Sequence, residues 1–468
     1  MADRISFTLN DRPVEIEPFE ISGVSPMTTL LDWLRERRGL RGTKEGCAEG
    51  DCGACTVVLE RGGGRREAVN SCIALLGQID GLSVRTVEGL SGADGGPHPV
   101  QTAMAEADAT QCGFCTPGFV MSVFAFAGSG EAAEPDTVHE VLAGNLCRCT
   151  GYRPIVEAMG RVAGLANPPP AVPAAIPVRT AAAAFDGMFY APRSLHDLLA
   201  LRRAHPEARL LAGGTDLGLD ASRARKPPAS VIHLTHVPEL QTISATGERL
   251  AIGAAVTYTA AAPLLIEAFP ALRPYLSRLG SRQIRNLGTI GGNIANGSPI
   301  GDMPPVLLAL EASVRLVSAR GAREMPLEEF FVGYRRTALA PDEIIESLSM
   351  PRLWPHEVFF CDKVSKRRDQ DISTVAAAYR LRIVDGRFED VRIGFGGMAA
   401  TPKRATLIED ALKAEGFAAA IEAIPRQFEP LDDWRGTAAY RLQVAANLLR
   451  RLELRLAEPS RVMELEAL

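Results

Sequence analysis

Residues 45–57 read EGCAEGDCGACTV and put three cysteines into one glycine-rich loop directly before an apolar strand. Cys47, Cys52 and Cys55 follow the pattern C-x4-C-x2-C, and Cys72 comes after sixteen further residues. Glycines let such a loop bend and bring backbone N–H groups close to the sulfurs. The pattern predicts a site that takes three thiolates from one loop and a fourth from a neighbouring strand.

Eight of the nine cysteines lie between Cys47 and Cys149, and Cys361 stands alone. In a reducing compartment clustered thiols indicate metal or redox chemistry rather than disulfides. The C-x4-C-x2-C spacing is that of a plant-type ferredoxin loop holding one 2Fe-2S cluster. Zinc knuckles prefer paired C-x2-C units. The first set therefore favours iron-sulfur over zinc.

A second set of four cysteines follows in QCGFCTPG and GNLCRCTGY, as the pairs Cys112/Cys115 and Cys147/Cys149. Two cysteines one residue apart rarely both serve one tetrahedral zinc, whereas a cluster with two irons accommodates them. This segment has a helical pattern, and helix ends would bring the pairs together. It predicts a helical 2Fe-2S domain, with zinc as the alternative for these four thiols taken alone.

The surrounding pattern is of mixed α+β type. Alternation over residues 5–9 and 14–16 around Asn10 and Asp11 predicts a hairpin. Ser25 and Pro26 suit the start of a helix that Gly39 ends. The near-apolar run 119–127 is too short to span a bilayer and predicts a buried helix. Strands are expected over 376–383 and 391–395, and an amphipathic helix, whose apolar face belongs to the core, over 440–456.

Composition excludes several classes of protein. The 468 residues are 46% hydrophobic and carry a net charge of −5, so the chain has room for several cores and no general attraction to nucleic acid. The start MADRISFTLN lacks the features of a secretory signal, which predicts a cytoplasmic protein.

His233 and His236 lack ligand partners nearby in the sequence and are expected at a strand end or on the surface. Cys361 is expected to be a buried small hydrophobe.

Two glycine-rich loops in the second half suggest a nucleotide-containing cofactor, although no G-x-G-x-x-G is present. LLAGGTDL, residues 210–217, follows an apolar strand, and its free N–H groups could cradle a pyrophosphate. GTIGGNIANGSPIGD, residues 288–302, crowds glycines with polar side chains. Because the chain has 43 glycines, each loop alone is more typical of an ordinary surface turn than of a cofactor site. Their order and combination favour a cofactor site.

The cysteine motifs EGCAEGDCGACTV, QCGFCTPGFVMS and GNLCRCTGYRPI resemble those of the xanthine dehydrogenase and aldehyde oxidase family of molybdenum hydroxylases, with all eight ligand positions filled. The resemblance covers nearly the whole chain. It implies that the second cluster lies nearer the molybdenum centre, with Gln111 beside the pterin, and that the first lies nearer a flavin. It also implies a vanillyl-alcohol-oxidase/CO-dehydrogenase-type FAD fold. The FAD residues that it implies are Leu210, Leu211, Ala212, Gly213, Gly214, Thr215, Asp216, Leu217, Thr289, Gly292, Asn293, Asn296, Ser298, Asp302, Lys363 and Asp371, with Tyr334 near the nicotinamide approach.

The expected domains combine pattern and resemblance: a plant-type 2Fe-2S ferredoxin β-grasp domain, a four-helix-bundle 2Fe-2S domain, a Pro/Ala linker, an FAD-binding domain and a CO-dehydrogenase flavoprotein-like α+β domain. Their expected ranges are 1–90, 91–166, 167–184, 185–350 and 351–468. Because the molybdenum-binding part would exceed this chain, it is expected on a partner subunit.

The implied function is electron transfer in a xanthine dehydrogenase, which converts hypoxanthine to xanthine and urate. Electrons would pass from a molybdopterin subunit through two 2Fe-2S clusters and FAD to NAD+, in a heterotetramer of two small and two large subunits. No residue of this chain is expected to act as a catalytic acid or base. The alternatives are the same part of a molybdenum hydroxylase for aldehydes, N-heterocycles or CO, oxygen or a ferredoxin as acceptor, and a non-enzymatic zinc or redox scaffold.

Overall fold

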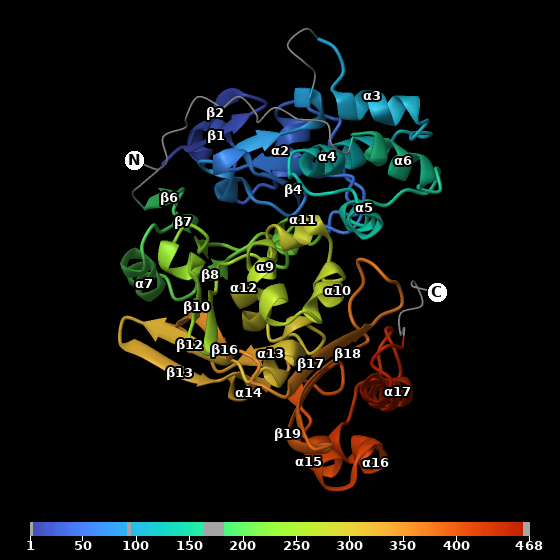
Figure 1. The fold of residues 1–468 in the computed structure, drawn as a ribbon. Coiled ribbons are helices and arrows are strands. Elements are labelled where there is room, and N and C mark those ends of the chain that lie inside the picture. The colour runs from blue at the N-terminus through green and yellow to red at the C-terminus, as the bar shows by residue number, and fades with distance from the viewer. Residues whose placement is uncertain (1–2, 91–94, 163–181, 462–468) are drawn as a thin grey trace. The chain divides into compact units, whose positions relative to one another are not determined.

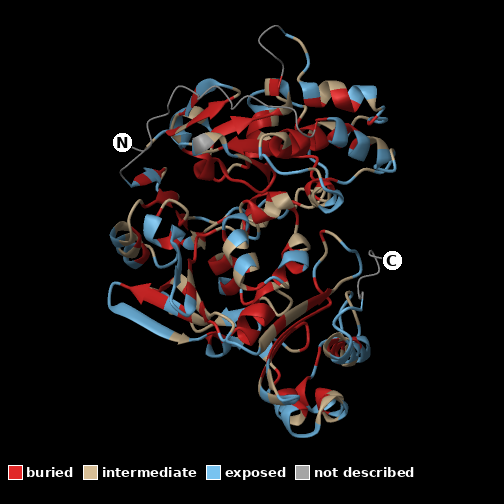
Figure 2. Cartoon of the chain, in the orientation of Figure 1, coloured by how far each residue is buried: buried red, intermediate tan, exposed pale blue. Residues whose placement is uncertain are grey.

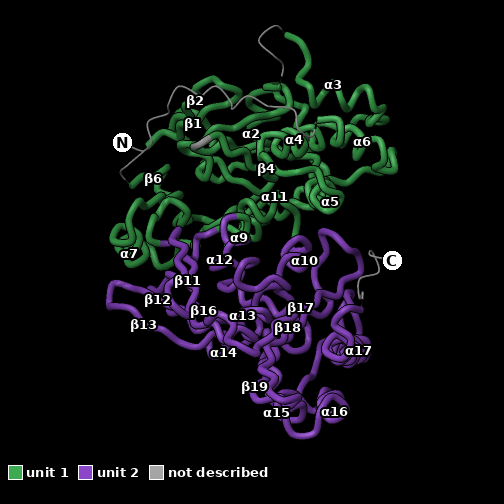
Figure 3. The backbone as a smooth tube through the Cα atoms, viewed as in Figure 1, with its two compact units in different colours: residues 1–239, 257–259, 280–289 green, residues 240–256, 260–279, 290–468 purple. Residues whose placement is uncertain are grey.

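The structure, a computed structural model, describes residues 3–90, 95–162 and 182–461. Most of the linker expected over 167–184 lies outside these residues. Contacts divide the chain into two compact units, which Figure 3 colours separately: residues 1–239, 257–259 and 280–289 form the first unit, and residues 240–256, 260–279 and 290–468 the second. The segment 185–350, expected as one domain, contributes a sheet to each unit.

The first unit begins with a five-stranded sheet in the order β2-β1-β5-β3-β4. Its elements are β1 (Ile5–Leu9), β2 (Arg12–Ile16), α1 (Phe19–Ser22), α2 (Leu30–Glu36), β3 (Thr56–Glu60), β4 (Arg66–Asn70) and β5 (Ser83–Arg85). β1 pairs in parallel with β5, and the other neighbours are antiparallel. Trp33 of α2 packs edge-on against Phe7 of β1 at 5.3 Å between ring centroids. The sheet and α2 thus share one core.

The predicted hairpin is confirmed, and the predicted start of the following helix is wrong. Asn10 and Asp11 adopt positive φ between β1 and β2, as a tight turn needs. Ser25 forms a turn, with its carbonyl accepting the Thr28 N–H, so the helix begins later. Thr29 caps it by accepting the Asp32 N–H at 3.0 Å.

A four-helix domain follows and confirms the helical pattern. It consists of α3 (Pro99–Glu106), α4 (Thr116–Ala127), α5 (Pro135–Leu142) and α6 (Arg153–Val162). Residues 118–126 of α4 are all buried, as the apolar run predicted, and Figure 2 shows this helix as the most buried of the four. α3 packs against α6, and α4 contacts the other three helices. The loops before α4 and between α5 and α6 carry the second cysteine set.

A smaller sheet, ordered β6-β7-β9-β8, completes the first unit. Its elements are β6 (Ala183–Phe185), β7 (Phe189–Ala191), α7 (Leu195–Ala204), β8 (Arg209–Leu211), α8 (Gly218–Ala221) and β9 (Val231–His233), with α11 (Arg282–Arg285) added from later in the chain. β9 pairs in parallel with both β7 and β8. Phe185, Phe189 and Val231 of this sheet share a hydrophobic cluster with Phe7. The small sheet therefore packs directly against the first sheet.

The second unit has an antiparallel sheet in the order β10-β11-β16-β12-β13. Its strands are β10 (Ile243–Thr246), β11 (Arg249–Gly253), β12 (Ser313–Ser318), β13 (Gly321–Pro326) and β16 (Ile344–Pro351), with a hairpin of β14 (Phe331–Gly333) and β15 (Arg336–Thr337). The helices are α9 (Tyr258–Ala268, mostly in this unit), α10 (Leu272–Ser277), α12 (Ile290–Ala295), α13 (Met303–Ala309) and α14 (Leu327–Phe330). α13 packs against strands of the next sheet and so joins the two halves of this unit.

The chain ends in an antiparallel sheet and three helices: β17 (Glu357–Val364), β18 (Val375–Val384), β19 (Arg387–Gly396), β20 (Lys403–Arg404), α15 (Thr406–Glu415), α16 (Phe417–Gln427) and α17 (Ala438–Ala457). The predicted strands and final helix are confirmed. Leu448, Leu449 and Leu452 of α17 are buried, and Leu442 packs against the same core. The mixed α+β class is confirmed. Among the described helices, none combines the length and apolar character that a membrane span needs.

Candidate cofactor sites

The first cysteine set comes together at one end of the first sheet, where its thiols meet in pairs. Cys47 lies within hydrogen-bonding reach of Cys52, and Cys55 within reach of Cys72. Cys55 and Cys72 are buried in a small cluster with Leu31 and Ile73. Two pairs of thiols suit two irons that share bridging sulfides, because each iron then takes one pair.

Backbone N–H groups surround one thiol of the Cys47/Cys52 pair. The N–H groups of Glu49, Asp51 and Cys52 all point at Cys47 Sγ, with N···S distances of 3.3–3.4 Å. The Cys52 side chain, together with the backbone N–H groups of Cys52, Asp51 and Gly50, lowers the pKa of Cys47 to about 5 against the opposing effect of burial. The loop is therefore shaped to stabilise negative charge on sulfur, as a metal-bound thiolate requires.

The second set is paired in the same way. Cys112 lies within reach of Cys149, and Cys115 within reach of Cys147. Thr150 donates its backbone N–H to Cys147 Sγ at 3.5 Å. Each pair takes one cysteine from before α4 and one from the loop between α5 and α6, so the fold, and not the C-x2-C or C-x-C spacing, decides which thiols meet.

Within residues 3–90, 95–162 and 182–461, no three His, Cys, Asp or Glu side chains converge on a single metal position. A tetrahedral zinc would draw four ligands to one point. Four thiols in two pairs instead fit a centre with two irons. Both sets thus supply four thiols in two pairs, the kind of donor set that a 2Fe-2S cluster takes.

The flavin residues predicted by resemblance fall into two groups, the first of which lies in the first unit. Residues 210–217 run from the end of β8 to the start of α8, and Thr289 is buried. A Cβ at Gly213 would overlap the carbonyl oxygen of Leu287. Gln78, which sequence reasoning missed, donates Nε2 to Ala212 O at 3.3 Å. Backbone pressed against backbone leaves this loop little freedom.

The other group lies in the second unit. Gly292 and Asn293 are in α12, and Asp302 is the N-cap of α13. Asn296 is exposed, Ser298 partly buried, and the Asn293 amide oxygen is buried without a hydrogen-bond partner in the described structure. A polar ligand would satisfy such an atom. The loop therefore fits the polar cofactor that its composition predicted.

Lys363 and Asp302, far apart in sequence, form an ion pair with Nζ 2.6 Å from Oδ2. Sequence reasoning missed the residue that supports this pair. Arg278 donates to Lys363 O and Ser365 Oγ at 2.9 and 3.1 Å, and to Arg368 O at 3.1 Å. It thereby fixes the segment that leads to Asp371, which accepts the Arg367 N–H at 2.9 Å. No sequence motif marks Arg278, because its role depends on tertiary contacts.

The remaining residues that the sequence singled out lie as follows in the structure. Tyr334 is 59% exposed on the turn between β14 and β15, and Gln111 is exposed beside Cys112. Cys361 is largely buried and donates to Ala271 O. His233 ends β9, as expected, but it is only 1% exposed and packs against His236, so the surface alternative is wrong for His233. The strand carries it into the core against Phe189.

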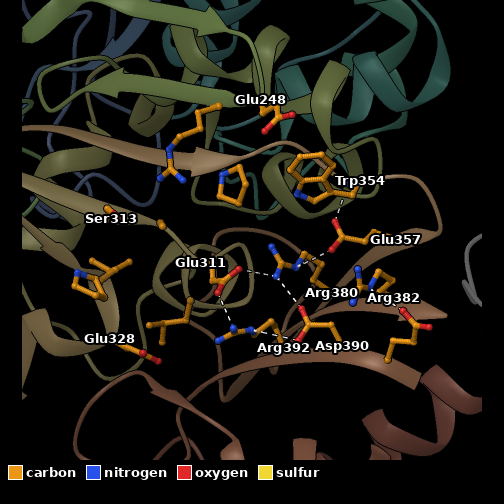
Figure 4. Close-up of a pocket in the computed structure, with 17 residues that line it drawn as sticks. Glu248, Glu311, Ser313, Glu328, Trp354, Glu357, Arg380, Arg382, Asp390 and Arg392 are labelled. Carbon is orange, nitrogen blue, oxygen red and sulfur yellow. Dashed lines mark hydrogen bonds and ion pairs between the residues drawn. The ribbon is translucent and has the colours of Figure 1, made fainter. Parts of the chain in front are cut away.

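The second unit also contains a pocket of about 680 Å³ that none of the predicted flavin residues lines (Figure 4). Arg380 lines this pocket and forms ion pairs with Glu311 at 2.7 Å and with Asp390 at 3.1 Å, and Arg392 forms an ion pair with the same glutamate at 2.6 Å. These charges neutralise one another inside the wall of the pocket. This network of ion pairs has a structural role, and we assign no ligand to the pocket.

Four family models match the chain in order. They describe a 2Fe-2S iron-sulfur cluster binding domain (residues 13–76), a [2Fe-2S] binding domain (86–160), an FAD binding domain in molybdopterin dehydrogenase (183–353) and a CO dehydrogenase flavoprotein C-terminal domain (361–456). The chain therefore has two 2Fe-2S-binding domains and one FAD-binding domain. Its class is that of an iron-sulfur flavoprotein.

A xanthine dehydrogenase of Oryza sativa subsp. japonica is 32% identical over 81% of this chain, which spans 34% of that relative. The chain thus covers about a third of the curated relatives it matches. A carbon monoxide dehydrogenase from Hydrogenophaga pseudoflava is 30% identical, with a TM-score of 0.55 over 58% of this chain and 97% of its own. Quinoline 2-oxidoreductase from Pseudomonas putida 86 is 28% identical, with a TM-score of 0.53 over the same shares.

These similarities place the chain in the molybdenum hydroxylase family of oxidoreductases. Within that family it is the part that binds iron-sulfur clusters and FAD.

Proposed function

We propose that this chain is the electron-transfer subunit of a xanthine dehydrogenase. The observation that carries the proposal is the pairing of all eight cysteines into two binuclear sets within one unit of a chain that also has an FAD-binding domain. When bound, the iron-sulfur groups carry single electrons, and the flavin converts between one-electron and two-electron steps. The proposed path begins at a molybdenum centre on a partner subunit and ends at NAD+.

The chain's own residues bind and orient these groups. We propose as cluster ligands the thiols of Cys47, Cys52, Cys55 and Cys72 for the first cluster and of Cys112, Cys115, Cys147 and Cys149 for the second. Burial of Cys55 and Cys72 excludes water from one side of the first site. Exposure of Cys112 and Cys149 leaves the second site open, as access for a partner's redox centre requires. In this scheme no residue of the chain breaks a substrate bond.

For the flavin we propose the residues implied by the resemblance, namely residues 210–217, Thr289, Gly292, Asn293, Asn296, Ser298, Asp302, Lys363 and Asp371. The glycine turn after β8 would offer its backbone N–H groups to a pyrophosphate. The amide oxygen of Asn293 would accept a hydrogen bond from the cofactor. The proposed domain boundaries are those expected from the sequence.

Relatives with different substrates bear on the choice of xanthine. The rice xanthine dehydrogenase aligns with 81% of this chain, whereas the carbon monoxide and quinoline enzymes align through chains that cover 58%. The first alignment spans more of the fused order of iron-sulfur and flavin domains, and this favours a xanthine dehydrogenase over the carbon monoxide and quinoline enzymes. In the carbon monoxide enzyme, 97% of the matching chain is covered, so the matched part is a separate chain there. Division among chains supports a partner subunit, with two copies of each as the proposed assembly.

The test is the visible spectrum of the native complex before and after anaerobic xanthine, with iron, zinc, molybdenum and FAD counted on the same sample. We expect about four irons and one FAD per chain, bleaching by xanthine, and reoxidation by NAD+. Bleaching only by an aldehyde, another heterocycle or CO would keep the family assignment and reject the xanthine proposal. Zinc in place of iron would reject the proposed cluster ligands.

A further inference from the structure

The two cysteine loops are joined directly by a backbone hydrogen bond. Leu146 N–H donates to the Cys52 carbonyl oxygen at 3.0 Å. Cys52 belongs to the first cysteine set, and Leu146 immediately precedes Cys147 of the second. One hydrogen bond is therefore the only non-covalent step on a path along the chain from Cys52 Sγ to Cys147 Sγ.

A buried amide holds this junction in place. Asn145, 1% exposed, donates Nδ2 to Gly53 O at 3.0 Å, one residue along from Cys52. Its Oδ1 accepts hydrogen bonds from Ser122 Oγ of α4 at 2.7 Å and from Gln283 Nε2 at 3.1 Å. A buried amide with both ends satisfied is rigid, because every alternative orientation would leave polar atoms unpaired.

The backbone segments around the Asn145 amide are closely packed. Gly53 has φ +69°, and a Cβ there would overlap the Gly144 carbonyl oxygen. A Cβ at Gly118, three residues after Cys115, would overlap the Gly53 carbonyl oxygen. The first loop thus touches, backbone to backbone, both segments that carry the second cysteine set.

The other side of the first loop is also in contact with the second set. A Cβ at Gly46 would lie 3.6 Å from the Phe114 ring, and Phe114 lies between Cys112 and Cys115. The Lys44 ammonium donates to Gly113 O at 3.5 Å and lies 5.8 Å from the centroid of the Phe114 ring. The two loops are therefore tethered at two separate places, of which only one depends on Asn145.

From these contacts we propose that Asn145 is a positioning residue that sets the separation and the through-bond connection of the two clusters. The inference rests on the proposed function, since both clusters must be bound. The step that it serves moves one electron from the reduced cluster to the oxidised one, and no covalent bond or proton changes place. Electron transfer weakens steeply with distance and favours bonded paths, so loosening this junction slows it.

The test compares Asn145→Ala with wild type in the purified complex. The matched control is Ile155→Val, which trims a fully buried side chain of α6 in the same domain. Iron is counted, and the electron paramagnetic resonance spectrum of the fully reduced protein is recorded at low temperature. Two reduced clusters in one molecule split or broaden each other's signals by an amount that depends on their separation and connection.

We expect wild type and the control to show two cluster signals with mutual splitting. Asn145→Ala should keep about four irons and both sets of g-values but lose much of the splitting, and electrons should equilibrate more slowly between its clusters after a rapid one-electron reduction. Unchanged splitting and rate in the iron-replete variant would overturn the inference, as would wild type with two clusters and no splitting. Wild type without iron would instead overturn the proposed function.

A second variant keeps the test decisive if Asn145→Ala loses iron. Asn145→Asp preserves the volume and the acceptor for Ser122 and Gln283, but an ionised carboxylate cannot donate to Gly53. The same loss of splitting is expected. Ser122→Ala removes a partner of Asn145 and leaves the Gly53 contact, so it should lose less of the splitting than Asn145→Asp. If Ser122→Ala lost more of the splitting than Asn145→Asp, the hydrogen bond to Gly53 would not be the critical contact.

Discussion

Lys363 and Asp302 form an ion pair withdrawn from solvent: Nζ lies 2.6 Å from Oδ2, and the side chains are 1% and 13% exposed. Lys363 also donates to Arg278 O at 3.0 Å, and Ser373 Oγ donates to the second carboxylate oxygen of Asp302 at 2.6 Å. The pair connects β17 to the start of α13. A site proposed for the flavin is therefore also a structural junction within its unit.

Removing only one charge of this pair should be costly. In Lys363→Met the Asp302 carboxylate stays buried with Ser373 as its remaining side-chain donor, and loss of a buried partner typically costs about 3–5 kcal/mol. We expect a lower melting temperature of the flavin-free protein and a lower FAD content. The double variant Lys363→Met/Asp302→Asn should recover stability but not FAD. Lys413→Met, which breaks an exposed pair with Asp410, is the control. Equal melting temperatures for both single variants would contradict the prediction.

The His233/His236 pair should make folding acid-sensitive. Burial holds the pKa of His233 well below its ordinary value and lowers that of His236 to about 4, with Arg193 and Arg61 adding to both shifts. Unfolded histidine titrates near 6.5, so between about pH 6.5 and 4 the unfolded state binds more protons. Stability therefore falls with falling pH in that window, by up to about 1.4 kcal/mol per unit for each histidine.

Melting temperature measured from pH 7.5 to pH 5 tests this dependence. His236→Gln should reduce the fall between these values, because one buried group no longer needs to become charged on unfolding at low pH. His196→Gln changes an exposed side chain and should leave the slope as in wild type. A wild-type slope in His236→Gln would show that this histidine does not contribute.

Ligand cysteines should differ sharply from Cys361. Cys72→Ser removes one thiolate of the first cluster, so iron should fall from about four to about two per chain while the second cluster stays. Cys361→Ser should keep all iron, since the Cys361 thiol donates to Ala271 O and a hydroxyl can do the same. Iron analysis together with electron paramagnetic resonance measures both results. Full iron in Cys72→Ser would remove Cys72 from the proposed ligand set.

The glycine loop after β8 should tolerate no side chain at Gly213. In Gly213→Ala the new Cβ would meet the Leu287 carbonyl, and overpacking of this kind commonly costs about 1–3 kcal/mol. We expect the loop to shift and FAD to dissociate more readily, as measured by flavin fluorescence released on dilution. Gly160→Ala, in α6 with open space around it, is the matched control and should keep FAD. Equal FAD retention in both variants would count against residues 210–217 as part of the flavin site.

Much of the fold was predictable because local chemistry dictated it. The positive φ of Asn10 and Asp11 follows from their preference for turns, and the strands β18 and β19 coincide with the segments expected as strands over 376–383 and 391–395. The start of α2 was not predictable in the same way: Pro26 offered an equally good local start, and the Thr29 cap depends on which residues the core buries.

By itself the sequence determined which thiols are available and that they form two groups of four, because ligand spacing is a local property. Only the tertiary structure decided which thiols pair, since Cys115 meets Cys147 through helix packing and not through spacing. It likewise made Asn145, Arg278 and Gln78 supports of the candidate sites. Their partners are distant in sequence, and a contact between distant residues exists only after the chain has buried its core.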